Sequence, residues 1–155
     1  MAVLRAAALA LVAFHASAAD LTGRIHRVHD GDTLTIATGR ERVTVRLQDI
    51  DAPELAQPFG WESRALLRAL CPAGVPAEAD GTRRDRYGRL IARVQCSGVD
   101  VQEAQVRAGA AWVFIRYAPK GSPLYSIEAA ARDGNRGLWA TPSPVPPWEY
   151  RRQVR

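Results

Sequence analysis

The chain has 155 residues, the usual length of one domain, and it is 47% hydrophobic and 24% charged, which excludes a disordered protein. No apolar run reaches the roughly 18 residues of a membrane-spanning helix, which excludes a polytopic membrane protein. The formal net charge is +5 and Lys120 is the only lysine among 21 basic residues; arginine suits phosphate oxygens, but a GC-rich genome would produce the same bias.

The first 18 residues have the pattern of a secretory signal peptide. MAVLR carries one positive charge, nine apolar residues follow, and Ala16-Ser17-Ala18 matches a small-x-small cleavage site. We prefer this interpretation to a buried N-terminal helix because the stretch has no polar face. The mature chain, residues 19–155, is then expected to be secreted or periplasmic.

Alternating apolar residues and turn signals predict short strands along the mature chain, at 22–28, 33–38, 42–47, 75–84, 90–95 and 111–117. Apolar residues at helical spacing predict three helices, at 60–71, 101–108 and 122–132. This pattern predicts one α+β domain over residues 19–140, a five-stranded β-barrel with three helices. Four prolines between 142 and 147 predict that residues 141–155 form an extended surface tail without a helix.

The two cysteines, Cys71 and Cys96, are most simply a disulfide in an oxidising compartment. Two free buried thiols and half of a metal site are the alternatives. The sequence offers no clustered histidine pair to complete a zinc site.

Three clusters of polar residues carry the candidate chemistry: Asp30-Gly31-Asp32-Thr33, the segment 46–54, and Asp85-Arg86-Tyr87-Gly88-Arg89. Each has an ordinary structural explanation by itself. The first is a plausible hairpin turn, the carboxylates of the second are suited to capping the next helix, and the third is a plausible solvated turn.

Together the clusters supply what phosphodiester hydrolysis needs. The carboxylates of Asp32 and Asp51 suit a hard cation such as Ca²⁺, and Glu54 is close enough in sequence to handle a proton. Arg46 and Arg89 are able to clamp a phosphate through two hydrogen bonds each.

The sequence resembles the staphylococcal nuclease family in the segments VHDGDTLTI, VRLQDIDAPE and DRYGRLIARV, and further along in DVQEAQVRAGAAWVF and ARDGNRGLW. The resemblance covers roughly residues 22–140, in order and at compatible spacing. It implies an OB-fold barrel and Ca²⁺-dependent hydrolysis of DNA and RNA by in-line attack of water.

The resemblance also implies residue roles. Asp32, Asp51 and the backbone carbonyl of Ala52 would bind calcium. Glu54 would be the general base or would orient the attacking water, and Arg46 and Arg89 would contact the phosphate. The nucleotide would be bound by Arg86, Tyr87 and Tyr117, while a second tyrosine of the family is replaced by Ile115.

Two further departures from the family pattern stand out. Asp49 replaces a glycine or apolar residue and adds a carboxylate near the site. Gln105 replaces a leucine on the apolar face of a helix, where a buried amide needs partners.

The sequence therefore predicts a secreted, monomeric, Ca²⁺-dependent nuclease acting on DNA, RNA or both. The alternative is a noncatalytic OB-fold module that binds nucleic acid or protein. A binding module has no chemical need to keep all five of the residues assigned to cation, proton and phosphate.

Overall fold

The computed structural model describes residues 20–154, so the predicted signal peptide lies outside the described residues. The strands are β1 (Leu21–Val28), β2 (Thr33–Ala37), β3 (Arg42–Leu47), β4 (Ile50–Asp51), β5 (Pro76–Arg84), β6 (Leu90–Cys96), β7 (Val99–Asp100) and β8 (Trp112–Val113). The helices are α1 (Gly60–Leu70), α2 (Val101–Arg107), α3 (Leu124–Asp133), the 3₁₀ helix η1 (Gly137–Ala140) and α4 (Pro147–Gln153). No helix in the described part of the chain is long and apolar enough to cross a bilayer.

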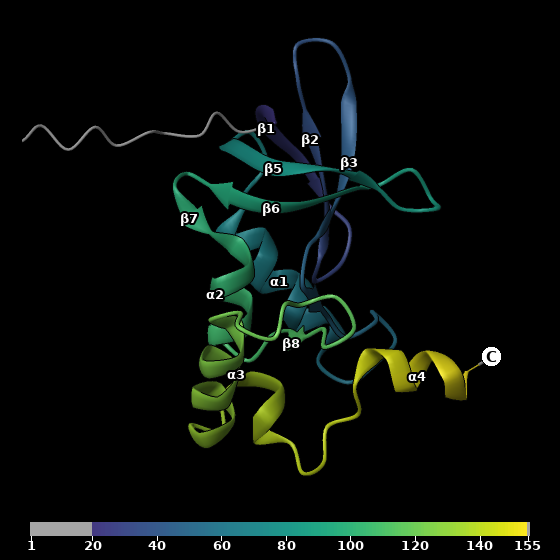
Figure 1. Ribbon diagram of the computed structural model, residues 1–155, viewed down its shortest axis with the longest axis vertical. Helices are drawn as coiled ribbons and strands as arrows, with labels where there is room; N and C mark the ends of the chain where they lie inside the picture. The colour runs from purple at the N-terminus through teal and green to yellow at the C-terminus, as the bar shows by residue number, and fades with distance from the viewer. Residues whose placement is uncertain (1–19, 155) are drawn as a thin grey trace, which may run out of the picture.

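Five strands close into a barrel, as the sequence predicted. β1, β2 and β3 form an antiparallel meander, β5 pairs with β1, and β6 pairs with β5. A parallel pairing of β3 with β6 closes the ring, with Val45 opposite Leu90 and Leu47 opposite Ala92. Figure 1 shows the barrel strands above and most of the helices gathered at one end. This arrangement is an OB-fold barrel.

The alternation of the strands determines which residues fill the barrel. In β3, Val43, Val45 and Leu47 are buried and the intervening side chains are less so. Leu67 of α1 and Val106 of α2 are fully buried in the same core, so these helices cover the barrel with one apolar face each.

A two-stranded sheet, β4 with β8, stands beside the barrel and carries Asp51 opposite Trp112. The predicted strand over 111–117 is much shorter in the structure, because β8 ends at Val113. The Phe114 N–H donates to the Asp49 carbonyl, and the chain then turns, with the Tyr117 N–H bonded to the Phe114 carbonyl. Tyr117 therefore lies on a loop.

The predicted disulfide is confirmed: Cys71 at the end of α1 is bonded to Cys96 at the end of β6. Both residues are buried, and their Cα atoms are 5.5 Å apart. The bond joins α1 to the barrel across 25 residues of sequence.

Removing this bond is expected to destabilise the protein. Cys71→Ala combined with Cys96→Ala should lower the free energy of unfolding by about 3 kcal/mol, since a cross-link of this span restricts the unfolded chain. Urea unfolding measures the loss. Dithiothreitol should lower the midpoint of the wild type and leave the double variant unchanged; equal stability of the two proteins would contradict the prediction.

The prediction of an extended, helix-free tail is wrong for residues 147–153, which form α4, so the three predicted helices are joined by a fourth. Pro147 occupies the first turn of α4, where its missing N–H costs nothing, and Pro146 precedes it in an extended conformation. Trp148 anchors the helix, because its ring stacks on Phe114 and meets the edge of Trp112.

Candidate active site

The turn between β1 and β2 holds Asp32 in a buried position at the end of the barrel. The Asp32 N–H donates to Asp30 Oδ1 at 3.0 Å, and Thr33 Oγ1 donates to Asp32 Oδ1 at 3.1 Å. The Ala52 N–H donates to Asp32 Oδ2 at 2.6 Å. The last bond ties this turn to the loop that follows β4, so two of the sequence clusters meet here.

Arg46 of β3 joins the two buried aspartates. Its Nη1 lies 2.9 Å from Asp32 Oδ2, and its Nη2 lies 2.8 Å from Asp51 Oδ1. Nη1 also donates to the backbone carbonyls of Leu47 and Ile50. The guanidinium is therefore held rigidly between the two carboxylates, with 15% of the side chain exposed.

Asp32 lies close to other carboxylates and is shielded from water, which makes its negative charge unfavourable. Burial raises the pKa of Asp32 well above its ordinary value, and the neighbouring charges of Asp30 and Asp51 raise it further. Arg46 and the hydrogen bond from Ala52 oppose this rise in pKa. Buried carboxylates of this kind are stabilised by bound positive charge.

Glu54 lies on the loop after β4, and 43% of its side chain is exposed. The loop is held by Gln57, whose Oε1 accepts from the Glu54 N–H and whose own N–H donates to the Glu54 carbonyl. Helix α1 begins at Gly60 and its N-terminus has no side-chain cap, so Glu54 does not cap it. The capping explanation is thereby removed for Glu54.

Arg89 approaches the same site from the turn before β6. Asp85 holds it, accepting from Arg89 Nε at 2.8 Å and from the backbone N–H groups of Tyr87 and Arg89. Arg89 Nη1 lies 3.4 Å from Thr33 Oγ1, next to Asp32. The third cluster is therefore a turn that Asp85 stabilises by hydrogen bonds and that holds Arg89 next to the Asp32 turn.

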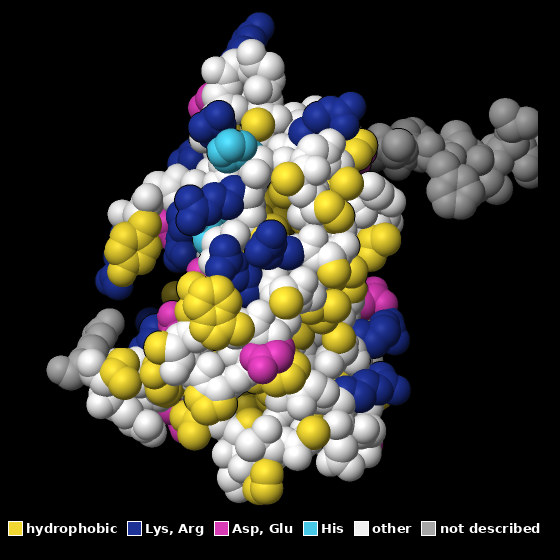
Figure 2. Space-filling model, turned by 180° about the vertical axis from the view of Figure 1, so that it is seen from behind, with side chains coloured by type: hydrophobic (Ala, Val, Ile, Leu, Met, Phe, Trp, Pro, Cys, Tyr) yellow, Lys and Arg dark blue, Asp and Glu magenta, His cyan; other side chains and the backbone are white. Residues whose placement is uncertain are grey.

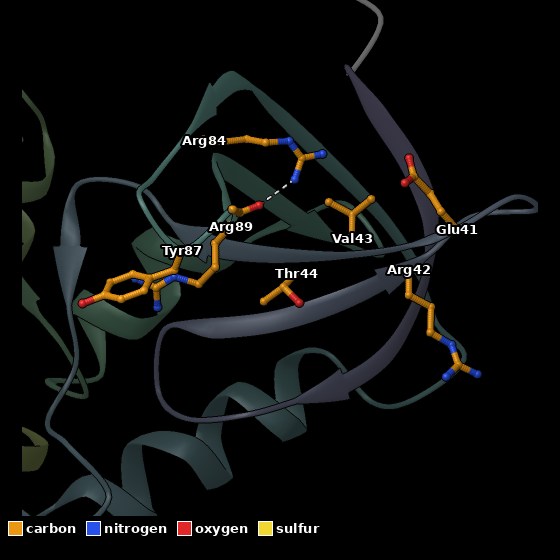
Figure 3. A pocket seen from close by; sticks show the side chains of 8 residues that line it. Glu41, Arg42, Val43, Thr44, Arg84, Tyr87 and Arg89 are labelled. Carbon is orange, nitrogen blue, oxygen red and sulfur yellow. Dashed lines mark hydrogen bonds between the residues drawn. The ribbon is translucent and has the colours of Figure 1, made fainter.

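Exposed aromatic and basic side chains surround Arg89. The Tyr87 ring is 68% exposed and lies beneath the guanidinium groups of Arg86 and Arg89. A cavity of about 420 Å³ opens beside it; Figure 3 shows its lining, formed by Glu41, Arg42, Val43, Thr44, Arg84, Tyr87, Gly88 and Arg89. A cleft of stacking surface and positive charge suits a nucleotide.

The remaining predicted nucleotide contact, Tyr117, is exposed and meets the edge of Phe114. Ile115, at the position of the missing tyrosine, is 69% exposed. Both follow β8 and share its loop, and no hydrogen bond or ion pair joins either side chain to the carboxylates in the described part of the chain.

The two departures from the family pattern have different places in the structure. Asp49 is a turn residue with φ of 64°, a conformation that aspartate tolerates and glycine prefers, and its carboxylate accepts from Gln48. Gln105 is completely buried, and its Nε2 donates to the carbonyls of Gly31 and Ser63. Gln105 thus braces the turn that holds Asp32, a role that its position on an apolar helix face did not reveal.

One residue of the site was missed entirely. Arg151 of α4 contacts Asp51 and Glu54, with Nη2 at 2.7 Å from Asp51 Oδ2 and Nη1 at 2.7 Å from Glu54 Oε1. Burial works to lower the pKa of Arg151, but the hydrogen bonds and charges of Asp51 and Glu54 outweigh it and raise the pKa. The sequence PWEYRRQ, a proline followed by helix-forming residues, was the available signal.

The oxygen donors present fit a hard divalent cation. Asp32 and Asp51 are buried, face a common guanidinium, and are adjacent to the backbone of Ala52. Carboxylate and carbonyl oxygens are the ligands that Ca²⁺ takes. No group of three or more His, Cys, Asp or Glu side chains is gathered at metal-binding spacing within residues 20–154, so water and substrate oxygens would have to complete the coordination.

Comparisons with known proteins relate this chain to nucleases. The family model described as staphylococcal nuclease homologue matches residues 44–141. An uncharacterized endonuclease from Escherichia coli O157:H7 is 42% identical over 135 residues, 86% of each chain. A micrococcal nuclease from Shigella flexneri is 35% identical over 166 residues, covering 98% of this chain and 94% of its own. An uncharacterized endonuclease from Haemophilus influenzae is 37% identical over 136 residues, covering 86% of this chain and 75% of its own.

These relatives favour the enzyme over a noncatalytic binding module, since they are named as nucleases and match this chain over most of its length. The chain therefore belongs to the staphylococcal nuclease family and is a phosphodiester hydrolase that acts on nucleic acid.

Proposed function

We propose that this nuclease is exported, works as a monomer and requires Ca²⁺. The observation that carries the calcium requirement is the pair of buried carboxylates, Asp32 and Asp51, beside the Glu54 loop. Export is supported by the pattern of residues 1–18 and by the disulfide, because such bonds persist in oxidising compartments.

In this proposal Asp32, Asp51 and the Ala52 carbonyl would hold the cation, which would supply positive charge to screen the phosphate. Glu54 accepts the proton of the attacking water. Arg46 and Arg89 donate to phosphate oxygens as charge builds on them. Arg86, Tyr87 and Tyr117 bind the nucleotide by charge and stacking.

Chelation tests the calcium requirement directly. We expect the purified protein to degrade DNA or RNA with Ca²⁺ present, to stop when the ion is chelated, and to recover when it is restored. Asp51→Asn should weaken Ca²⁺ binding and activity together, on the order of 10- to 100-fold, as perturbed metal sites typically do. Calorimetry measures the affinity and a nuclease assay the rate.

Asp133→Asn, an exposed aspartate at the end of α3, is the matched control and should change neither quantity. Unchanged Ca²⁺ affinity in folded Asp51→Asn would remove Asp51 from the cation site. Activity that survives chelation in the wild type would refute the calcium requirement.

Export is tested by expressing the full chain in a Gram-negative host. We expect a protein whose first residue is Ala19, found in the periplasm or medium, because the signal peptidase cleaves after small-x-small. Mass spectrometry of each fraction determines the N-terminus. Recovery of an intact Met1 terminus in the cytosol as the only product would contradict export.

A further inference from the structure

Helix α4 lies outside the region matched by the family model, which ends at residue 141, yet it is docked against the active site. Gln57 Nε2 donates to the Val145 carbonyl at 2.5 Å, and Tyr150 Oη donates to the Ala56 carbonyl at 3.2 Å. With the Trp148 ring stacked on Phe114, these contacts hold the C-terminal segment beside the Glu54 loop (Figure 1). We call residues 141–154 the C-terminal strap.

The strap places the positive charge of Arg151 against Asp51 and Glu54, the carboxylates that the proposed function assigns to cation binding and to proton transfer. Arg151 Nη2 donates to Asp51 Oδ2, and its Nη1 is shared between Asp51 Oδ1 and Glu54 Oε1. Asp51 Oδ1 also accepts from Arg46, so both oxygens of Asp51 are engaged by guanidinium groups. A cation that binds Asp51 therefore competes with these two arginines for the carboxylate.

Arg151 is the one more easily displaced. Arg46 is on a central strand of the barrel, is 15% exposed and makes two further bonds to backbone carbonyls. Arg151 is 37% exposed on a seven-residue helix, and its guanidinium bonds are to Asp51 and Glu54. Its long side chain is able to swing into solvent without disturbing the barrel.

We propose that Arg151 is an internal competitor for the active-site cation, so that the C-terminal strap restrains the nuclease until a divalent cation displaces it. This inference rests on the proposed calcium function. Cation binding and docking of Arg151 on the carboxylates are then linked reciprocally, because each weakens the other by the same factor. The enzyme is then restrained at low calcium concentration and freed at high concentration.

Calorimetric titration of the purified mature protein with Ca²⁺, without substrate, tests the competition. Arg151→Ala should bind Ca²⁺ about tenfold more tightly than the wild type, the factor that corresponds to ~1.4 kcal/mol of competing interaction. Arg152→Ala is the matched control, since it removes the same charge from an exposed position on the same helix. Its affinity should stay within about twofold of the wild type.

Hydrogen exchange of the wild-type protein provides a measurement that needs no variant. Saturation with Ca²⁺ should speed amide exchange in residues 147–153, while exchange in the barrel strands stays constant. Equal Ca²⁺ affinity of both variants, or no change of exchange in α4, would overturn the inference. A loss of activity in Arg151→Ala at unchanged affinity would also overturn it, by making Arg151 a substrate-contacting group.

The calcium requirement is tested separately from the competition: if it is wrong, the wild type remains active when Ca²⁺ is chelated. If the wild type requires and binds Ca²⁺ while Arg151→Ala binds it no more tightly, the competition alone is refuted.

A separate observation concerns a basic hollow between β1 and α1. It has a volume of about 330 Å³, and its charged lining is entirely basic: His26, Arg27, Arg64 and Arg68. Figure 2 shows arginine side chains gathered on one face of the molecule. None of these three arginines is ion-paired with a carboxylate among the described residues.

An exposed aromatic ring lies next to one of the arginines that line the hollow. Trp61 is 61% exposed, and the Arg64 guanidinium lies 5.2 Å above its ring. The Arg64 Nε is buried without a hydrogen-bond partner. Clustered arginines without carboxylates beside a stacking surface match a nucleic-acid backbone, whose phosphates accept and whose bases stack.

We infer that this basic hollow binds a polynucleotide away from the bond that is cleaved, so that long substrates are held better than short ones. Strand β1 contributes to the lining of the hollow and is followed directly by the turn that carries Asp32, so a single bound strand is able to contact both the hollow and the active site. The inference rests on the nuclease activity of the chain and is independent of calcium.

Arg64→Ala combined with Arg68→Ala tests it in binding measurements made with a chelator present. Affinity for a 30-nucleotide strand should fall, and the slope of log affinity against log salt should decrease by about 1.4, since each lost contact to single-stranded phosphate contributes about 0.7. Affinity for a trinucleotide should not change. Arg107→Ala with Arg136→Ala, two exposed arginines elsewhere, is the control.

Equal affinities and slopes for the test and control variants would overturn this inference. Binding of the same variants to vesicles of anionic lipid is measured alongside. If Arg64→Ala with Arg68→Ala still binds the polynucleotide but no longer binds the vesicles, the inference is also overturned, and the hollow is assigned to a membrane surface.

Discussion

Glu54→Gln should lower kcat by ~10²–10⁴-fold, the usual contribution of a general base. Water is a poor nucleophile, so a nearby proton acceptor matters. Asp51 is buried and engaged by two arginines, whereas Glu54 is 43% exposed on a loop that opens to solvent. Glutamine keeps the size of the side chain and its bond from Arg151 but cannot accept the proton.

Single-turnover kinetics measure this loss, with Ca²⁺ and nucleotide affinities determined alongside. Both affinities should be largely retained. Glu62→Gln, an exposed glutamate in the first turn of α1, is the control and should leave kcat unchanged. A near-normal kcat in folded, Ca²⁺-loaded Glu54→Gln would remove Glu54 from the mechanism.

Arg89→Lys should reduce kcat by ~10²–10³-fold, the cost typical of losing one donor to charge that develops in the transition state. Lysine keeps the charge but loses the planar fork that Asp85 orients through Arg89 Nε. If Arg89 acts on the developing charge, kcat falls more than substrate binding does.

Steady-state kinetics separate the two effects. Arg107→Lys, an exposed arginine of α2 that does not line this cavity, is the control and should leave kcat unchanged. A raised KM at intact kcat would instead make Arg89 a substrate-holding residue. Arg46→Lys should also lower kcat, but Arg46 bonds to Asp32 and Asp51, so its variant will change cation binding as well.

The barrel strands were predictable from sequence because the determinants of a strand are local, whereas closure pairs β3 with the distant β6. Period-two alternation in residues 42–47 shows which side chains enter the core, and the predicted boundaries of that strand agree with β3. The Asp30-Gly31-Asp32 turn and the segment Asp85–Arg89 were identified for the same reason, since turn chemistry resides in neighbouring residues. The disulfide followed from the cysteine count once export was assumed.

The tail was mispredicted because the number of prolines between 142 and 147 was used to exclude a helix anywhere in residues 141–155, although the effect of a proline depends on its position in a helix. Pro147 stands in the first turn of α4, where proline is compatible with a helix. Trp148 stabilises the helix by packing on Phe114 and Trp112. A seven-residue helix gains little from its own backbone bonds, so its stability comes from contacts distant in sequence.

The sequence by itself therefore determined the barrel, the disulfide pair and the types of residue that carry the chemistry. Only the tertiary structure decided which of these residues meet. Arg151 reaches Asp51 and Glu54 across about a hundred residues, and Gln105 reaches Gly31 across 74. A side chain of either kind has no local signature for such a partner, because the attraction between a charge and a carboxylate, or between an amide and a carbonyl, depends on the distance that folding sets.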